Sequence, residues 1–228
     1  MTTPTEISRL LTTTLPPKSK TPAAARTAMS NEIKNMDKIN ICVFGASSRN
    51  LGKDYIDAAH ELGVLIAQQG WGCVNGAGSE GLMRAVSDGA LSAGGEVTGV
   101  IPQFMIDNGW AYDALTHIVP TGDMHERKKT MTHLSRAMVA LPGGVGTLEE
   151  LLEIITWRQL NLSPKPIVIL NTSGYYNNLV NMLNDAIAGG FMKKSHSRLW
   201  RVVDTPRQAI EAIKEEFQQG PASIEPKN

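Results

Sequence analysis

Short runs of Val, Ile and other apolar residues alternate along the chain with longer segments whose apolar residues recur every three or four positions. The short runs predict buried strands, and the longer segments predict amphipathic helices. Strands are expected at 39–45, 71–79, 96–102, 116–120, 137–144, 165–171 and 198–204. Helices are expected at 55–70, 81–94, 124–137, 147–160, 175–190 and 206–218. Because strands that alternate with helices are typical of βαβ units, we predict a three-layer α/β fold with a Rossmann-like, doubly wound, mostly parallel sheet of six to seven strands.

The beginning of the chain does not share this pattern. Residues 1–37 mix Thr, Pro, Lys and Ala with few large apolar side chains, so we expect them to form a disordered extension. A single Rossmann-like domain is expected over 38–219, followed by a short tail at 220–228. The first 30 residues hold four bases and one acid, a bias that resembles a transit peptide. An organellar destination therefore stays open beside the cytoplasmic location that we predict.

Composition excludes several classes of function. The 228 residues include 22 bases and 22 acids, which leaves no basic excess to hold nucleic acid through its phosphates. Cys42 and Cys73 are too few for a disulfide framework, and both fall in apolar runs, which indicates a reducing, intracellular environment. No apolar run approaches the ~20 residues that span a bilayer. We therefore predict neither a nucleic acid nor a membrane as partner.

Three glycine-bearing turns follow predicted strands: FGASS (44–48), NGAGSEG (75–81) and LPGGVGT (141–147). The carboxyl ends of parallel strands share one edge of the sheet, where ligands bind. Backbone N–H groups in such turns, with the N-terminus of the next helix, bind anions. Each turn alone is explained equally well by turn chemistry, but three at one edge favour a nucleotide or phosphate site. No P-loop is present, and no turn fits the dinucleotide fingerprint.

The helix predicted at 147–160 carries an acidic residue with two interpretations. Thr147 and Glu150 fit a capping box, in which Glu150 only closes the end of the helix. If the backbone N–H groups at the start of this helix bind an anion instead, the Glu150 carboxylate is free to take part in chemistry. Apolar positions fall on two stripes, one with Leu148, Leu151, Leu152 and Ile155, the other with Glu150, Ile154 and Trp157. A helix that is apolar on two faces must be covered twice, so we predict a homodimer built through this helix, with Glu150 near its interface.

The helix predicted at 124–137 places an arginine on its inward face. That face is marked by Met124, Met131, Leu134 and Met138, while Lys128 lies at its border and His125 and Lys129 face outward. Arg127 shares the inward face and needs an anionic partner, because an unpaired buried charge is very costly. A structural pair with Glu150 or another carboxylate and a contact with substrate both stay open, and the two are compatible.

Taken together, these segments resemble a known family. PGGVGTLEE (142–150) fits the pattern P-G-G-x-G-T-x-x-E, MHERKKTM (124–131) precedes it and ITW (155–157) follows it. With FGASS and NGAGSEGLM, the chain is similar over roughly 39–218 to the Lonely Guy family of cytokinin-activating enzymes, formerly labelled lysine decarboxylases. The resemblance implies a Rossmann-like fold and a dimer or a dimer of dimers. It also implies hydrolysis of the N-glycosidic bond of N6-modified adenosine 5′-monophosphates to free cytokinin base and ribose 5-phosphate.

The resemblance also implies roles for individual residues. Arg127 and Glu150 match the catalytic pair. Positions that bind the substrate phosphate and ribose are expected at Ser48, Lys128, Gly143, Gly144, Gly146, Thr147, Glu149 and Thr156. The first motif reads GASS where relatives often read GSS, so Ser48 is our choice between two serines. The acidic residue that the family carries after its IP-x-x-M segment has no clear match in 106–115, a loop longer than the family's, so substrate selectivity is expected to differ.

The chemistry of these residues requires no added group. Departure of a base leaves a positive charge on the sugar, which a carboxylate near C1′ stabilises while it orients or deprotonates water. The five histidines form no H-x-x-x-H pair, and no lysine lies in a setting for a pyridoxal Schiff base, so we expect no metal and no cofactor. Two alternatives remain: a general AMP or nucleoside-monophosphate hydrolase, and a non-catalytic nucleotide-binding module that needs neither Arg127 nor Glu150.

Overall fold

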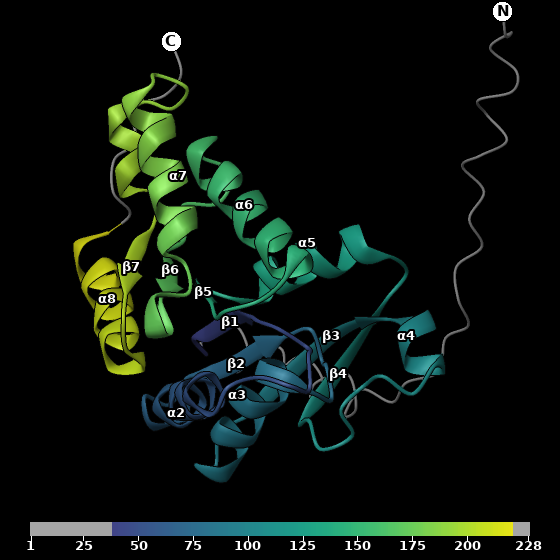
Figure 1. Cartoon of the computed structure of the whole chain (residues 1–228). Coiled ribbons are helices and arrows are strands. Elements are labelled where there is room, and N and C mark those ends of the chain that lie inside the picture. Colours follow the sequence, from purple (N-terminus) through teal and green to yellow (C-terminus); the bar gives the residue numbers. More distant parts are fainter. Residues whose placement is uncertain (1–37, 221–228) are drawn as a thin grey trace, which may run out of the picture. The chain divides into compact units, whose positions relative to one another are not determined.

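A computed structural model describes residues 38–220, in which strands and helices alternate around one sheet (Figure 1). The strands are β1 Asn40–Phe44, β2 Gly72–Asn75, β3 Val97–Pro102, β4 His117–Thr121, β5 Ala137–Ala140, β6 Ile167–Leu170 and β7 Arg201–Val203. The helices are α2 Lys53–Gln68, α3 Gly81–Ser92, α4 Gln103–Asp107, α5 Met124–Leu134, α6 Val145–Gln159, α7 Asn177–Ala188 and α8 Pro206–Gln219, with short 3₁₀ turns η2 Thr172–Gly174 and η3 Lys194–Arg198. The predicted extension at 1–37 and all but the first residue of the predicted tail at 220–228 lie outside the described residues.

The sheet has a switch point at its centre. Its order is β4-β3-β2-β1-β5-β6-β7, and every pair of neighbouring strands is parallel. The chain winds outward from β1 to β4 and then returns to place β5 on the other side of β1, where Ile41 lies opposite Ala137. The loops after β1 and β5 therefore depart in opposite directions and leave a crevice between them. The doubly wound α/β fold predicted from the sequence is confirmed.

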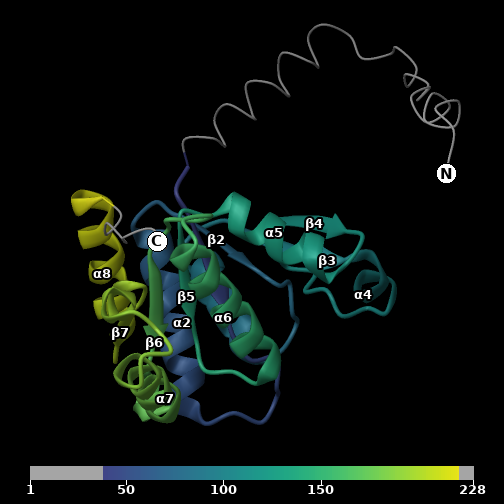
Figure 2. The ribbon, with the colours of Figure 1, turned by 90° about the horizontal axis from the view of Figure 1, so that it is seen from above.

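Helices cover both faces of this sheet. Ile41 and Val43 of β1 pack in a core with α2, α3 and α8, whereas Cys42 and Phe44 pack in a second core with α5, α6 and α7. Figure 1 shows the two helical layers above and below the strands, and Figure 2 looks down on the layer that contains α5, α6 and α7. Because both faces are buried, the central strands are apolar throughout rather than alternating, which made them easy to recognise in the sequence.

The helix predicted at 124–137 is shorter than expected, and its buried face differs from the predicted one. Helix α5 ends at Leu134, because Ser135 adopts extended backbone angles and its hydroxyl donates to the carbonyl of Met131. Met138 therefore belongs to β5, and Met131 is buried while Met124 and Leu134 are exposed. In the segment predicted as a loop after β3, residues 103–107 form the short helix α4.

Helix α6 buries one continuous face, and not the two stripes that we predicted. Its buried apolar residues are Leu151, Ile154 and Ile155, which lie at helical spacing and pack on the sheet. Leu152 is exposed instead. The side chain of Ile154 is thus covered by the chain's own core, and Glu150 and Trp157 are partly buried within the same chain.

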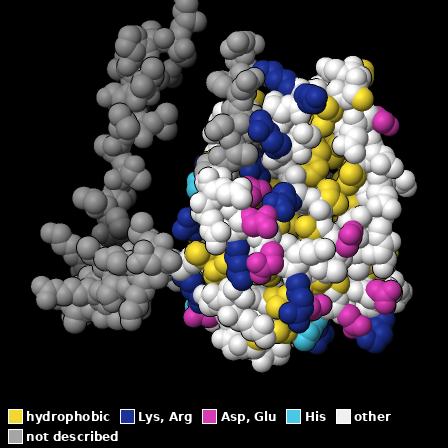
Figure 3. Space-filling view, turned by 90° about the vertical axis from the view of Figure 1, so that its left-hand side faces the viewer, with side chains coloured by type: hydrophobic (Ala, Val, Ile, Leu, Met, Phe, Trp, Pro, Cys, Tyr) yellow, Lys and Arg dark blue, Asp and Glu magenta, His cyan; other side chains and the backbone are white. Residues whose placement is uncertain are grey.

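No helix in the described part of the chain is long and apolar enough to cross a bilayer. On the face shown in Figure 3, basic and acidic side chains are interspersed and neither sign dominates, in keeping with the balanced charge of the sequence.

Candidate active site

A cavity of about 360 Å³ opens at the switch point of the sheet. The loop after β1 and the amino end of α6 form two of its walls, and the backbone N–H of Ala46 donates to the carbonyl of Pro142 across 3.1 Å to join the two loops. The lining residues are Gly45, Ala46, Ser47, Ser48, Met83, Met105, Arg127, Gly144, Gly146, Thr147 and Glu150. Of the residues predicted for the site, the cavity therefore brings together Ser48, Gly144, Gly146, Thr147, Arg127 and Glu150.

Helix α6 begins two residues earlier than the sequence predicted. Its N-cap is Gly144, which has no side chain to satisfy the exposed N–H groups. Thr147 therefore lies inside the first turn and cannot be the N-cap, so the predicted capping box of Thr147 and Glu150 is wrong. Among the described residues, the N–H groups of residues 143–147 have no acceptor. Such unpaired N–H groups, at the positive end of the helix dipole, form a site for an anion.

Glu150 lies one helical turn beyond these N–H groups. It follows Thr147 by three positions and Gly146 by four, so all three lie on one face of α6 and line the cavity. Its side chain is only 11% exposed within a single copy of the chain, and one oxygen, Oε1, lies 3.3 Å from Nη1 of Arg127. The burial of Glu150, which we had attributed to an oligomer interface, thus needs no partner chain.

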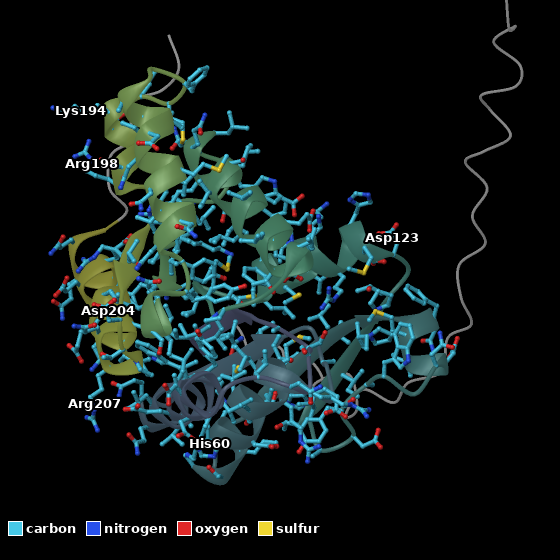
Figure 4. The ribbon with its side chains drawn as sticks, viewed as in Figure 1. His60, Asp123, Lys194, Arg198, Asp204 and Arg207 are labelled. Atoms are coloured by element: carbon cyan, nitrogen blue, oxygen red, sulfur yellow. The ribbon has the colours of Figure 1, made fainter. Side chains whose placement is uncertain are left out.

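Helix α5 presents Arg127 to the cavity from a capped end. The carboxylate of Asp123 accepts the N–H of Glu126 at 2.8 Å and is the N-cap of α5. This hydrogen bond holds the pKa of Asp123 below its ordinary value. Figure 4 shows Asp123 at the outer end of α5. Arg127, one turn further on, is buried as predicted.

Three acceptors fix the guanidinium of Arg127. Nε donates to the carbonyl of Val100 at 3.0 Å, Nη2 donates to the carbonyl of Gly76 at 3.4 Å, and Nη1 faces Glu150. A Cβ at position 76 would lie 1.8 Å from Nη2. The second glycine-bearing turn therefore makes room for the arginine and, unlike the other two turns, contributes no glycine to the cavity wall.

Burial raises the pKa of Glu150 to about 7, although the nearby guanidinium of Arg127 lowers it. The desolvation effect is the larger because the carboxyl group loses most of its water, whereas one cation 3.3 Å away restores only part of that stabilisation. A carboxyl group with a pKa near neutrality can take up and release a proton at physiological pH.

Four predicted site residues lie outside this cavity. The buried Lys128 pairs with Glu149 and, at 3.0 Å, with Glu153, so it ties α5 to α6. Thr156 is exposed on α6 and its hydroxyl donates to the carbonyl of Leu152 at 2.8 Å. Gly143 adjoins the cavity wall without lining it. We had predicted Lys128 at the border of the helix face, and it is instead nearly inaccessible.

Two apolar residues that line the cavity, Met83 and Met105, were not predicted from the sequence. Both lie in segments that we had noted for other reasons, Met83 within NGAGSEGLM and Met105 within IP-x-x-M. Only the fold brings α3 and α4 to the same cavity. Nothing in the sequence around Met83 and Met105 therefore indicated that these side chains line a binding site.

A larger cavity, of about 500 Å³, lies between α5 and α6 beside Trp157 and Lys165. It contains neither a glycine-bearing turn nor Glu150, so the smaller cavity is the candidate active site. Among the described residues, no group of three or more His, Cys, Asp or Glu side chains is arranged to hold a metal ion.

Comparisons with known proteins identify the family of this chain. A family described as possible lysine decarboxylase matches residues 83–213. A probable cytokinin riboside 5′-monophosphate phosphoribohydrolase of Oryza sativa subsp. japonica is 41% identical over 77% of this chain and 72% of its own. A cytokinin riboside 5′-monophosphate phosphoribohydrolase of Arabidopsis thaliana is 37% identical over 82% of this chain and 87% of its own.

Solved structures share the fold at lower identity. A molybdenum cofactor carrier protein from Chlamydomonas reinhardtii is 27% identical, with a TM-score of 0.63 over 79% of this chain and 99% of its own. A molybdenum cofactor binding protein from Rippkaea orientalis is 25% identical, with the same TM-score over 80% of this chain. Since the family match covers more than half of the residues and the plant relatives align over most of their length, the chain belongs to the Lonely Guy family, whose older description is possible lysine decarboxylase.

Proposed function

We propose that the protein hydrolyses the N-glycosidic bond of cytokinin riboside 5′-monophosphates, which are N6-modified adenosine nucleotides, to free cytokinin base and ribose 5-phosphate. One observation carries this proposal: a buried Arg127–Glu150 pair and a row of unpaired backbone N–H groups line or adjoin a single cavity. The plant relatives at about 40% identity, which carry this activity in their names, support it.

The phosphate end of the substrate binds at the amino end of α6. The N–H groups of residues 143–147 supply donors, and the hydroxyl of Ser48 adds one from the loop after β1. Lys128, Glu149 and Thr156 do not line this cavity within one copy of the chain. Binding energy gained at the phosphate, remote from the reacting carbon, helps to position the sugar for the chemical step.

The ribose end then faces Glu150. As the C1′–N bond breaks, its electron pair leaves with the base and positive charge develops on the sugar. The carboxylate of Glu150 stabilises this charge and accepts a proton from the water that attacks C1′. One water is consumed, its hydroxyl ending on the sugar and a proton on the base. Arg127 holds the carboxylate in place and keeps a larger fraction of it ionised, because its charge lowers the pKa of Glu150.

Product analysis with a panel of substrates tests this function. We expect the protein to release base and ribose 5-phosphate from isopentenyladenosine 5′-monophosphate, and to act far more slowly on the unphosphorylated riboside, because only the nucleotide can use the N–H groups of residues 143–147. Chromatography of the released base measures both rates.

The same panel decides between the alternatives. Equal rates with plain AMP would identify a general nucleoside-monophosphate hydrolase. Release of no base from any nucleotide would favour a binding module, a role in line with the carrier and binding proteins among the solved relatives.

We also propose that two copies of the chain associate through the outer side of α6. Val145, Leu152, Leu160 and Leu162 are exposed apolar residues on this helix and just after it. Light scattering is expected to give at least twice the 24.7 kDa mass of one chain, and Leu162→Asp is expected to reduce it. A monomeric wild-type protein would exclude the interface.

Cys42 and Cys73, free and buried, support the proposed cytoplasmic location.

A further inference from the structure

The loop after β6 lies next to the loop between β5 and α6, which carries the N–H groups of residues 143–147, because β6 neighbours β5 in the sheet. Asn171 organises this loop: its Oδ1 accepts the N–H of Tyr176 at 2.6 Å, and its Nδ2 donates to Asn177 at 2.8 Å. Ser173 and Gly174 both have positive φ angles, 53° and 71°, which turn the chain sharply. Two consecutive tyrosines, Tyr175 and Tyr176, follow this turn.

Both tyrosine hydroxyls reach the loop between β5 and α6. The hydroxyl of Tyr176 donates to the carbonyl of Leu141 at 2.7 Å, and that of Tyr175 donates to the carbonyl of Gly143 at 2.6 Å. The carbonyl between them, on Pro142, accepts the N–H of Ala46. Three successive carbonyl groups of the loop are thus each held by a donor from another part of the fold.

Holding a carbonyl also orients the N–H group that follows it. In a trans peptide the C=O and the next N–H point in opposite directions, and the described part of the chain has no cis peptide. The bond from Tyr175 to the Gly143 carbonyl therefore directs the N–H of Gly144 away from Tyr175. Gly144 lines the cavity, and its N–H has no acceptor among residues 38–220. The tyrosine hydroxyl thereby keeps this donor available for a ligand.

Position 143 cannot stabilise the loop by itself. A Cβ there would lie 2.1 Å from the hydroxyl oxygen of Thr147, which leaves room only for glycine. Glycine is the residue with the greatest backbone freedom, so the orientation of the peptide between Gly143 and Gly144 depends on outside contacts. The Tyr175 hydroxyl is such a contact, and its ring is itself held edge-on by Tyr55 and Tyr176, with ring centroids 6.0 and 5.0 Å away.

We propose that Tyr175 is a positioning residue for the phosphate site: its hydroxyl holds the Gly143 carbonyl so that the Gly144 N–H is presented to the 5′-phosphate of the substrate. This inference rests on the proposed function, since it assigns a phosphate to the loop. Tyr175 itself does not line the cavity.

Tyr175→Phe removes the hydroxyl and keeps the ring contacts. We expect KM for isopentenyladenosine 5′-monophosphate to rise roughly fivefold, the effect of one lost hydrogen bond, with kcat within about twofold. The kcat/KM for the unphosphorylated riboside should not change, because that substrate makes no use of the loop. Tyr175 is half exposed, so the variant is expected to fold, with a thermal midpoint within a few degrees of the wild type.

Tyr55→Phe is the matched control. Tyr55 packs on the same ring, and its hydroxyl has no hydrogen bond within residues 38–220, so its removal should leave KM for the nucleotide unchanged. An unchanged KM in Tyr175→Phe, or an equal loss of kcat/KM for nucleotide and riboside, would overturn the positioning role.

Calorimetric titration with ribose 5-phosphate separates this inference from the proposed function. Weaker binding to Tyr175→Phe than to the wild type is expected even if the wild type hydrolyses no nucleotide, an outcome that would refute only the hydrolase. Equal binding to both proteins would refute the role of Tyr175.

Discussion

Glu150→Gln is expected to lower kcat for hydrolysis of isopentenyladenosine 5′-monophosphate by about 100-fold or more, with KM within a few-fold of the wild type. The amide keeps the shape of the side chain, but it carries no charge to stabilise the cationic sugar and accepts no proton from water. The N–H groups of residues 143–147 are untouched, so the phosphate should still bind. Steady-state kinetics at pH 8, where most of the wild-type carboxyl group is ionised, give the clearest comparison.

Glu153→Gln provides the matched control. Glu153 lies one turn further along α6, pairs with Lys128 and does not line the cavity. Its loss is expected to change kcat by less than about threefold, in line with the small contribution of a partly exposed ion pair. Full activity in Glu150→Gln would mean that Glu150 serves only as the partner of Arg127.

Arg127→Met is expected to have the second-largest effect, a loss of roughly 100-fold in kcat/KM at pH 7, together with a change in the pH profile. In the wild type only the ionised form of Glu150 is active, so kcat/KM should fall as the pH drops through about 7. Arg127 lowers the pKa of Glu150, and its removal must raise that pKa. The acidic limb of the profile should therefore move to higher pH.

Lys129→Met controls for the loss of a positive charge on α5. Lys129 is exposed and lines the other, larger cavity, so its substitution should leave the acidic limb in place. Thermal unfolding at pH 6, where Glu150 is mostly protonated, checks that Arg127→Met remains folded. An acidic limb at the same pH in Arg127→Met and the wild type would show that the guanidinium does not control the ionisation of Glu150.

The fold was predictable because each central strand is buried on both faces. Runs such as ICVF and IVIL are apolar at every position. The segments between such runs have apolar residues at helical spacing, so strands and helices are easy to distinguish. The ends of elements were less accurate. Helix α5 stops at Leu134 because of the backbone angles of Ser135 and the hydrogen bond from its hydroxyl to the carbonyl of Met131. The spacing of apolar residues gives no information on either feature. The predicted three-layer fold with a mostly parallel sheet is confirmed, with every strand pair parallel, and so is the family predicted from motifs.

The site was predictable only in part, because motifs name residues and not their contacts. The loops after β1 and β5 were correctly expected at one edge of the sheet. Arg127 was correctly expected on the inward face of the helix that begins at Met124. The capping box failed because the start of α6 depends on backbone angles at Gly144. Gly76 was expected at an anion site, and only the three-dimensional contact reveals that it makes room for Arg127. Tyr175 lies 32 residues from the carbonyl that it holds, and no local pattern links the two.

A crystal structure of Glu150→Gln soaked with isopentenyladenosine 5′-monophosphate tests the assignment of the cavity most directly. Phosphate oxygens are expected about 3 Å from the N–H groups of residues 143–147, with C1′ roughly 4 Å from the side chain at position 150. A sugar bound elsewhere, with that side chain turned away from C1′ or the phosphate away from the amino end of α6, would contradict the assignment of Glu150 as the residue that stabilises the cation.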